Sequence, residues 1–295
     1  MTTAHPHETG SAPIAKFRLL LAAIRFEHSI FALPFAYLGM VLAADGLPTW
    51  WQFVWITIAM VAARTLAMSA NRLIDVEHDT LNPRTAARAL PAGLLKRGEM
   101  LAMALVSLAL FLAAAAMLNT LALALAPVAA VVVVSYSYVK RFSWLTHFVL
   151  GAADAIAPAG GWIGVSGRLP WEAVLLSLGV GMWIGGFDIF YACQDIDSDR
   201  KHGIHSIPKR FGTVGGFWVA RGMHLLTSMA LLGVGLSLGL TWPYYVGWAI
   251  ASALLVYEHW IISPTDLSRL NAAFFSVNGY IAVIVFGFAF FSLYV

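Results

Sequence analysis

The sequence predicts an all-α integral membrane protein, with about nine transmembrane helices in one bundle around a cavity that opens to the cytosolic side. Hydrophobic residues make up 60% of the 295 positions and charged residues only 11%, whereas soluble domains have roughly 45–50% and about 25%. The mean hydropathy is +0.78. The apolar residues also come in runs that approach or exceed the roughly 20 residues needed to cross a bilayer.

Four of the expected helices lie in the first half of the chain, at 18–44, 50–78, 99–118 and 121–138. The segment ADGLPTW ends the first, and a loop beginning NPRT follows the second. A short Leu-Asn-Thr break separates the third from the fourth. The tail at 1–17 is polar and lacks the basic start and short apolar core of a signal peptide, so we expect it to stay in the cytosol.

Five more helices are expected at 144–166, 172–196, 215–239, 242–262 and 272–294. The segments SGRLPWE, GLTWP and SPTDLSRLN supply the Gly, Pro and polar residues that interrupt helices between them. Together with the first four they would form a single membrane domain over residues 18–295.

Basic residues support this topology, because Lys and Arg concentrate in short cytoplasmic loops of membrane proteins. With nine spans and a cytosolic N-terminus, the loops facing the cytosol and the adjacent helix ends carry nearly all of them. These are Lys16, Arg18, Arg84, Arg88, Lys96, Arg97, Lys140, Arg141, Arg200, Lys201, Lys209, Arg210 and Arg269. The opposite loops carry only Arg168, and the modest net charge of +3 therefore reflects topology and indicates no nucleic-acid partner.

Two acidic segments end helices that run in the same direction, and so lie at the same membrane face. The first, NRLIDVEHD, places Asn71, Asp75 and Asp79 at i, i+4 and i+8, which is one helical face. Glu77 lies about 200° from Asp75 and is expected to face solvent.

The second segment, FDIFYACQDIDSDRKHG, places Asp188, Asp195 and Asp199 within an arc of about 40° if the helix continues through it. Asp197 falls on the far side and is expected to be solvated. Ionisable groups at membrane depth usually face a bundle interior or a watery cavity. Caps on helix ends are the simpler reading of either segment alone, but two aligned segments favour a site.

A divalent cation would relieve the repulsion among these acids. Mg²⁺ takes oxygen ligands, typically one or two carboxylates plus substrate phosphates, and the sequence lacks the His/Cys pattern of a zinc site. The single cysteine, Cys193, also excludes an internal disulfide. The predicted metal ligands are Asp75, Asp79, Asp188, Asp195 and Asp199.

Basic and polar residues beside these acids could hold phosphate oxygens. Anchoring by the positive-inside rule is the alternative for the lysines and for Arg141. The predicted substrate-binding set near the acids is Asn71, Arg84, Arg88, Tyr138, Lys140, Arg141 and Lys201.

These segments resemble those of the UbiA-type intramembrane aromatic prenyltransferases. That family carries an Asn-x-x-x-Asp-x-x-x-Asp motif on its second helix and an Asp-rich motif on its sixth. NPRTAARALPAG, YSYVKRFSWLTHFVLG and HGIHSIPKRFG resemble further segments of the family, so the similarity spans at least residues 25–212.

The resemblance implies transfer of a polyprenyl group from a polyprenyl diphosphate to an aromatic acid in quinone biosynthesis, with Mg²⁺ as cofactor. It also implies a multi-pass protein of the bacterial inner membrane. Asp75, Asp195 and Lys140 would be catalytic residues, because metal and cationic side chains stabilise charge on the leaving diphosphate. Arg64 would be the fourth catalytic residue, on the acceptor side.

The acceptor is expected to be of the 4-hydroxybenzoate type, with a dihydroxynaphthoate of menaquinone synthesis as the alternative. Either carries a carboxylate, which Arg25 or Arg64 could bind. Arg64 could instead form an ion pair with Asp154 or Asp188, and Asp154 could orient the acceptor hydroxyl or merely neutralise an arginine. A cation transporter and a CDP-alcohol phosphotransferase are the competing classes. A transporter would not need the paired arginines, and the phosphotransferase motif is absent.

Overall fold

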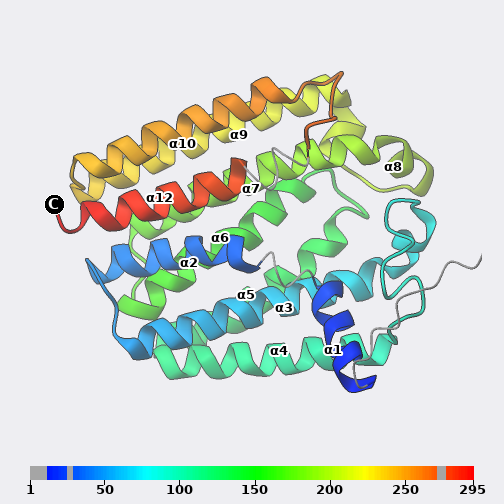
Figure 1. Ribbon diagram of the computed structural model, residues 1–295, viewed down its shortest axis with the longest axis horizontal. Helices are drawn as coiled ribbons and strands as arrows, with labels where there is room; N and C mark the ends of the chain where they lie inside the picture. The colour runs from blue at the N-terminus through cyan, green and yellow to red at the C-terminus, as the bar shows by residue number, and fades with distance from the viewer. Residues whose placement is uncertain (1–11, 25–28, 271–276) are drawn as a thin grey trace, which may run out of the picture.

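The computed structural model describes residues 12–24, 29–270 and 277–295, and within them the regular structure is helical with no named strand. The helices are arranged as a long bundle (Figure 1). α3 (Trp50–Leu81), α4 (Arg97–Leu118), α5 (Thr120–Val139), α6 (Thr146–Ser166) and α10 (Trp242–Ile261) begin and end within three residues of the predicted helices. α12 (Asn278–Ser292) lies inside the predicted last helix, whose first residues fall outside the described part.

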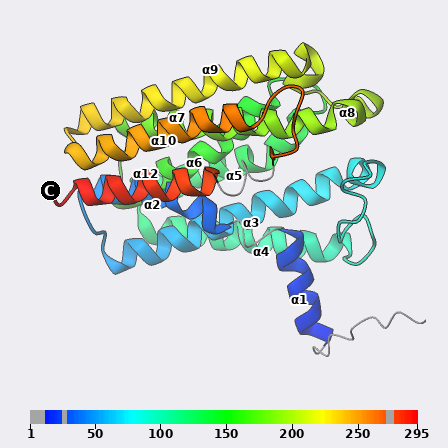
Figure 2. The same ribbon diagram turned by 45° about the horizontal axis from the view of Figure 1, so that its top comes forward.

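The first predicted helix is wrong as a single span, because residues 18–44 are divided between two helices. α1 (Ala12–Ala23) begins in the segment assigned to the polar tail, and α2 (Ser29–Ala44) follows separately. α1 extends away from the bundle axis beside α3 and α4 (Figure 2). An ion pair between Lys16 and Glu99 joins it to the start of α4, and Arg72 Nε donates to its Ala23 carbonyl at 3.0 Å.

The sixth and seventh predicted helices also differ from the structure. α7 (Trp171–Ala192) is followed by a single 3₁₀ turn at Cys193–Asp195 and by the short helix α8 (Ile196–His202), so the second acidic segment is not one continuous α-helix. α9 (Ile207–Leu238) begins eight residues before the predicted start at 215 and contains a kink at Gly212, where φ is +74°. Glycine adopts this backbone conformation without the steric cost that other residues incur.

Six helical segments among the described residues are long and apolar enough to cross a membrane. They are α3, α4, α5, α6, α9 and the combined α7–α8 segment. α2, α10 and α12 are not among these six. α2 and α12 have only 16 and 15 residues. α10 packs against α9 and α12. A multi-pass membrane protein is therefore confirmed, whereas the count of nine spans is not.

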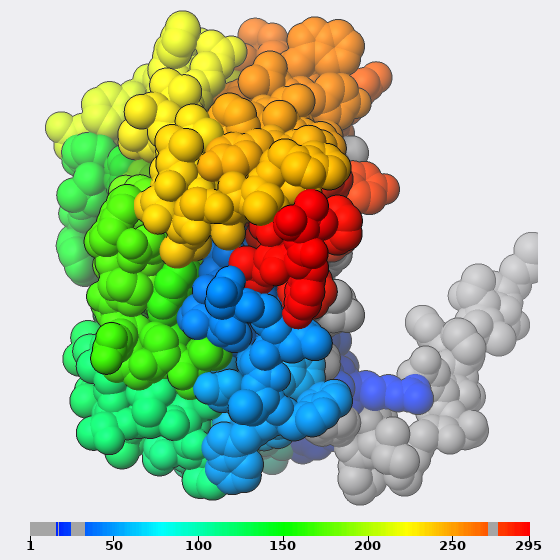
Figure 3. All heavy atoms as spheres, turned by 90° about the vertical axis from the view of Figure 1, so that its left-hand side faces the viewer, coloured from blue at the N-terminus to red at the C-terminus, as the bar shows by residue number. Residues whose placement is uncertain are grey.

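Both acidic segments lie at the same end of the bundle, which we call the motif end. It is formed by the loops at 82–96, 140–145, 203–206 and 262–270 (Figure 1). The other end, seen in Figure 3, carries the short connections between α2 and α3, between α6 and α7, and between α9 and α10. The topology argument correctly places the two acidic segments together.

Glycines allow α6 and α7 to approach closely, which positions part of the site. A Cβ added at Gly151 would lie only 2.2 Å from the carbonyl oxygen of Gly181, and one added at Gly185 would lie 2.7 Å from the carbonyl oxygen of His147. No side chain fits between the two backbones at these positions. The crossing therefore brings His147 of α6 next to the last turns of α7, where Asp188 lies.

Candidate active site

A polar cavity of about 320 Å³ opens at the motif end, between α3, the end of α5, α6, α7 and α8. It contains all five predicted metal ligands together with four predicted phosphate-binding residues. These nine are Asn71, Asp75, Asp79, Arg84, Arg88, Lys140, Asp188, Asp195 and Asp199.

On the α3 side, Asp75 is almost fully buried, at 3% exposure. Its Oδ2 accepts hydrogen bonds from Asn71 Nδ2 at 2.9 Å and from Lys140 Nζ at 2.5 Å. Its Oδ1 is buried and has no hydrogen-bond partner among the described atoms. One turn further along α3, both oxygens of Asp79 accept from Arg88 Nη1 at 2.9 and 2.8 Å.

On the α7–α8 side, Asp195 receives a bidentate pair from Arg84, with Nε to Oδ1 at 3.1 Å and Nη2 to Oδ2 at 2.7 Å. Asn82 Nδ2 adds a bond to Oδ1 at 3.3 Å. Burial alone would lower the pKa of Arg84, but the hydrogen bonds and attraction of Asp195 outweigh it and raise the pKa. Asp199 accepts from Ser206 Oγ at 3.0 Å.

Three of these acids, Asp75, Asp79 and Asp195, are therefore each paired with a basic side chain. No group of three or more His, Cys, Asp or Glu side chains converges as a ready metal site within the described part of the chain. The donor set nevertheless fits Mg²⁺, which needs only one or two carboxylates when phosphate supplies other ligands. The orphaned Oδ1 of Asp75 supports this fit, because buried polar atoms normally have partners.

Asp188 has a different partner from the other acids. Its Oδ2 is 2.7 Å from Nδ1 of His147, a residue only 2% exposed. Nε2 of the same ring accepts the backbone N–H of Ile207 at 3.3 Å. Sequence reasoning missed His147, because its partner is 41 residues away.

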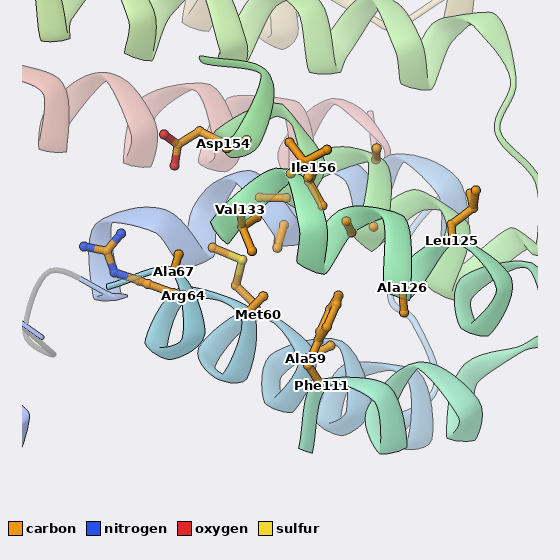
Figure 4. A pocket seen from close by; sticks show the side chains of 18 of the residues that line it. Ala59, Met60, Arg64, Ala67, Phe111, Leu125, Ala126, Val133, Asp154 and Ile156 are labelled. Carbon is orange, nitrogen blue, oxygen red and sulfur yellow. The ribbon is translucent and has the colours of Figure 1, made fainter. Parts of the chain in front are cut away.

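A second, apolar cavity of about 460 Å³ runs between α3, α4, α5 and α6. Tyr136 and Leu150 line both cavities, so the two meet there. Figure 4 shows Arg64 and Asp154 toward one end of the apolar cavity and apolar side chains, among them Phe111, Leu125 and Ala126, further from them. An electrostatic interaction links Asp154 to Arg64.

Several predicted residues lie elsewhere. Tyr138 is exposed and outside the polar cavity, whereas Tyr136, one turn before Lys140 on the same face, lines it. Arg141 is exposed and donates to the carbonyl of Ile74 at 2.5 Å. Lys201 is also exposed and does not line the cavity.

Arg25 lies outside the described residues. Glu77 and Asp197 are exposed, as the helical-face argument predicts. The cavity also contains residues that sequence reasoning did not single out as site residues, among them Arg72, Asn82, Tyr136, Ser137 and His147. The four-residue spacing between Tyr136 and Lys140 was the available signal for the tyrosine.

A model of the UbiA prenyltransferase family matches residues 32–290. The chain belongs to this family. Among its UbiA relatives, the 4-hydroxybenzoate octaprenyltransferase of Aliivibrio fischeri is 32% identical over 249 residues, covering 84% of this chain and 86% of that protein. The enzyme of the same name from Cupriavidus necator is 34% identical over 239 residues, covering 80% and 82%.

Solved UbiA structures share the fold. A UbiA homolog from Aeropyrum pernix K1 superposes with a TM-score of 0.79 at 30% identity, covering 89% of this chain and 96% of that one. A homolog from Archaeoglobus fulgidus, bound to DMAPP and Mg²⁺, gives a TM-score of 0.70 at 19% identity, covering 94% and 99%. UbiA membership decides against the transporter and the CDP-alcohol phosphotransferase.

Proposed function

We propose that this chain transfers a polyprenyl group from polyprenyl diphosphate to an aromatic acid of the 4-hydroxybenzoate type in quinone biosynthesis, with Mg²⁺ as cofactor. Its relatives named 4-hydroxybenzoate octaprenyltransferase support this reaction. The observation that carries it is the junction of the two cavities. A charged cavity suited to a diphosphate adjoins an apolar cavity suited to an isoprenoid, and Tyr136 and Leu150 line both.

The diphosphate would bind in the polar cavity by an exchange of partners. Asp75, Asp79, Asp195 and Asp199 would hold Mg²⁺, and the cations paired with Asp75, Asp79 and Asp195 would turn to the phosphate oxygens. When bound there, Mg²⁺ would supply positive charge that stabilises the leaving diphosphate. The cations are Arg84 and Arg88 from the 82–96 loop and Lys140 from the end of α5.

The same arrangement explains how the reaction proceeds. Cations around the diphosphate stabilise the negative charge that develops as the allylic C–O bond breaks. The apolar cavity excludes the water that would otherwise capture the allylic cation. The electron-rich ring attacks the cation and a new C–C bond forms. The ring proton would then pass to the released diphosphate, or to solvent, as aromaticity returns.

Arg64 and Asp154 would contact the acceptor, because they are the charged side chains at the otherwise apolar cavity. Arg64 would pair with the acceptor carboxylate, a role that Arg25 could share. A dihydroxynaphthoate is the alternative acceptor, since it carries the same carboxylate and phenol groups.

We also propose that α2, α10 and α12 cross the membrane with the six long spans, which gives nine. The motif end would face the cytosol of a bacterial inner membrane. Its loops and adjacent helix ends carry Arg84, Arg88, Lys96, Arg97, Lys140, Arg141, Arg200, Lys201, Lys209, Arg210 and Arg269, against Arg168 at the other end.

The function is tested with the full chain purified in detergent. We expect a prenylated product when radiolabelled geranyl diphosphate is supplied with 4-hydroxybenzoate or a dihydroxynaphthoate and Mg²⁺. Removing the metal with EDTA should abolish the product, and adding excess Mg²⁺ should restore it. Folded protein that prenylates neither acid would contradict the proposal.

A substitution of Arg64 tests the acceptor site. Arg64→Ala should raise the KM for the aromatic acid by about 10- to 100-fold, because a hydrogen bond to a charged group contributes about 1.5–3 kcal/mol. The KM for geranyl diphosphate should change little, since Arg64 does not line the polar cavity. Initial rates measured against each substrate separate the two constants. Equal increases in both would indicate a structural role.

A further inference from the structure

The pairing of His147 with Asp188 fixes which ring nitrogen carries the proton. A backbone N–H can only donate, so Nε2 of His147 must accept from Ile207 and therefore carries no hydrogen. The proton of the neutral ring is then on Nδ1, which donates to Asp188 Oδ2. The ring is held on both sides by residues of α7 and α9, and it is almost fully buried.

This partner sets Asp188 apart from the acids nearer the motif end. Asp75, Asp79 and Asp195 pair with lysine or arginine, whereas Asp188 accepts a hydrogen bond from a neutral ring. The hydrogen bond from His147 orients the Asp188 carboxylate, but a neutral ring does not neutralise its negative charge. The side chain remains 38% exposed at the cavity, so it can also accept a hydrogen bond from a bound molecule.

Asp188 also lies deeper in the bundle than the other acids of its segment. Seven residues separate it from Asp195, which corresponds to about 10 Å along a helix. On α6, residues His147, Leu150 and Asp154 share one face, at i, i+3 and i+7. Leu150 lines both cavities and Asp154 the apolar one, so His147 and Asp188 lie where the polar cavity approaches the junction.

We infer that His147 is a positioning residue, which aims the Asp188 carboxylate at the phenolic hydroxyl of the aromatic acceptor. This inference rests on the proposed function and assigns Asp188 to the acceptor and not to the metal. A carboxylate that accepts the hydrogen bond of a phenol increases electron density on the ring, which favours attack on the allylic cation. A cationic partner would weaken that effect, and the neutral His147 ring avoids it.

Two substitutions separate the two hydrogen bonds of His147. The amide nitrogen of asparagine can take the place of Nδ1, so His147→Asn keeps the donor to Asp188 but loses the acceptor for Ile207. The side chain of glutamine reaches the position of Nε2, so His147→Gln keeps a partner for Ile207 but not the donor. His147→Leu removes both bonds.

If His147 positions Asp188, the Asn variant should stay within about threefold of the wild type. The Gln and Leu variants should raise the KM of the aromatic acid about tenfold or more, with the KM for geranyl diphosphate unchanged. The KM values of all variants are measured with the acid that the wild type prenylates, either 4-hydroxybenzoate or a dihydroxynaphthoate. Mn²⁺ binding, followed by electron paramagnetic resonance in the presence of geranyl diphosphate, should be the same in all variants.

Other outcomes overturn the inference. If the Gln variant kept the wild-type KM for the aromatic acid and the Asn variant did not, the role of His147 would be to hold the first turn of α9. A fall in Mn²⁺ affinity would return Asp188 to the metal site, and full activity in all three variants would leave His147 without a role in the reaction. Thermal unfolding identifies a variant that does not fold, and the Asn–Gln pair decides the question even if the Leu variant is lost. Failure of the wild type to prenylate either acid contradicts the proposed function instead.

Discussion

Replacing Asp75 or Asp195 by asparagine is expected to lower kcat/KM by about 10³-fold. Asp75 and Asp195 lie on opposite sides of the polar cavity, and each pairs with a cation, Lys140 at 2.5 Å and Arg84 at 2.7 Å respectively. Asparagine keeps the shape but removes the charge needed to bind Mg²⁺. Loss of a single group that stabilises transition-state charge typically costs about 10²–10³-fold, and loss of a metal ligand also weakens binding of the diphosphate.

The chain supplies a matched control for each substitution. Glu77 lies two residues after Asp75 on α3, and Asp197 lies two residues after Asp195, yet both are exposed. Glu77→Gln and Asp197→Asn should therefore retain activity within about twofold of the wild type, because surface substitutions away from special features have small effects. Initial rates over a range of Mg²⁺ concentrations make the comparison. If Asp197→Asn proved as damaging as Asp195→Asn, the assignment of the second acidic segment would be wrong.

The two acidic segments show how far helical periodicity predicts the site. On α3 the rotation of about 100° per residue predicts the shared face correctly, because the helix is unbroken to Leu81. Asn71, Asp75 and Asp79 all line the cavity. The second segment leaves the α-helix at Ala192 and makes a 3₁₀ turn, so the count does not apply beyond that residue. Asp195 and Asp199 line the cavity all the same.

The pairing of side chains could not be predicted from spacing. Arg84 and Asp195 are 111 residues apart, and their contact depends on how the 82–96 loop folds over the end of α7. The bond between His147 and Asp188 depends on the close crossing of α6 and α7. Composition and periodicity indicate which residues are buried in a helix, whereas the distance between two helices is set by the residues at their crossing point.

Substituting alanine for Gly151 tests that crossing and is expected to damage both stability and activity. The new Cβ would lie 2.2 Å from the carbonyl oxygen of Gly181 and 3.0 Å from its carbonyl carbon. Both atoms belong to backbone and cannot rotate away, so α6 and α7 must separate. Overpacking of this kind typically costs about 1–3 kcal/mol. The separation would also draw His147 away from Asp188, so activity should fall further than the loss of folded protein explains.

Gly222→Ala is the control, because a Cβ at this position of α9 meets no heavy atom within 4 Å. It should leave turnover unchanged and alter stability by at most about 1 kcal/mol, in the favourable direction, since alanine favours the helix more than glycine does. Thermal unfolding in detergent and kcat/KM are measured for both variants. A Gly151→Ala protein as stable and active as the wild type would show that α6 and α7 lie further apart than the glycine contact requires, and that the His147–Asp188 pair does not depend on it.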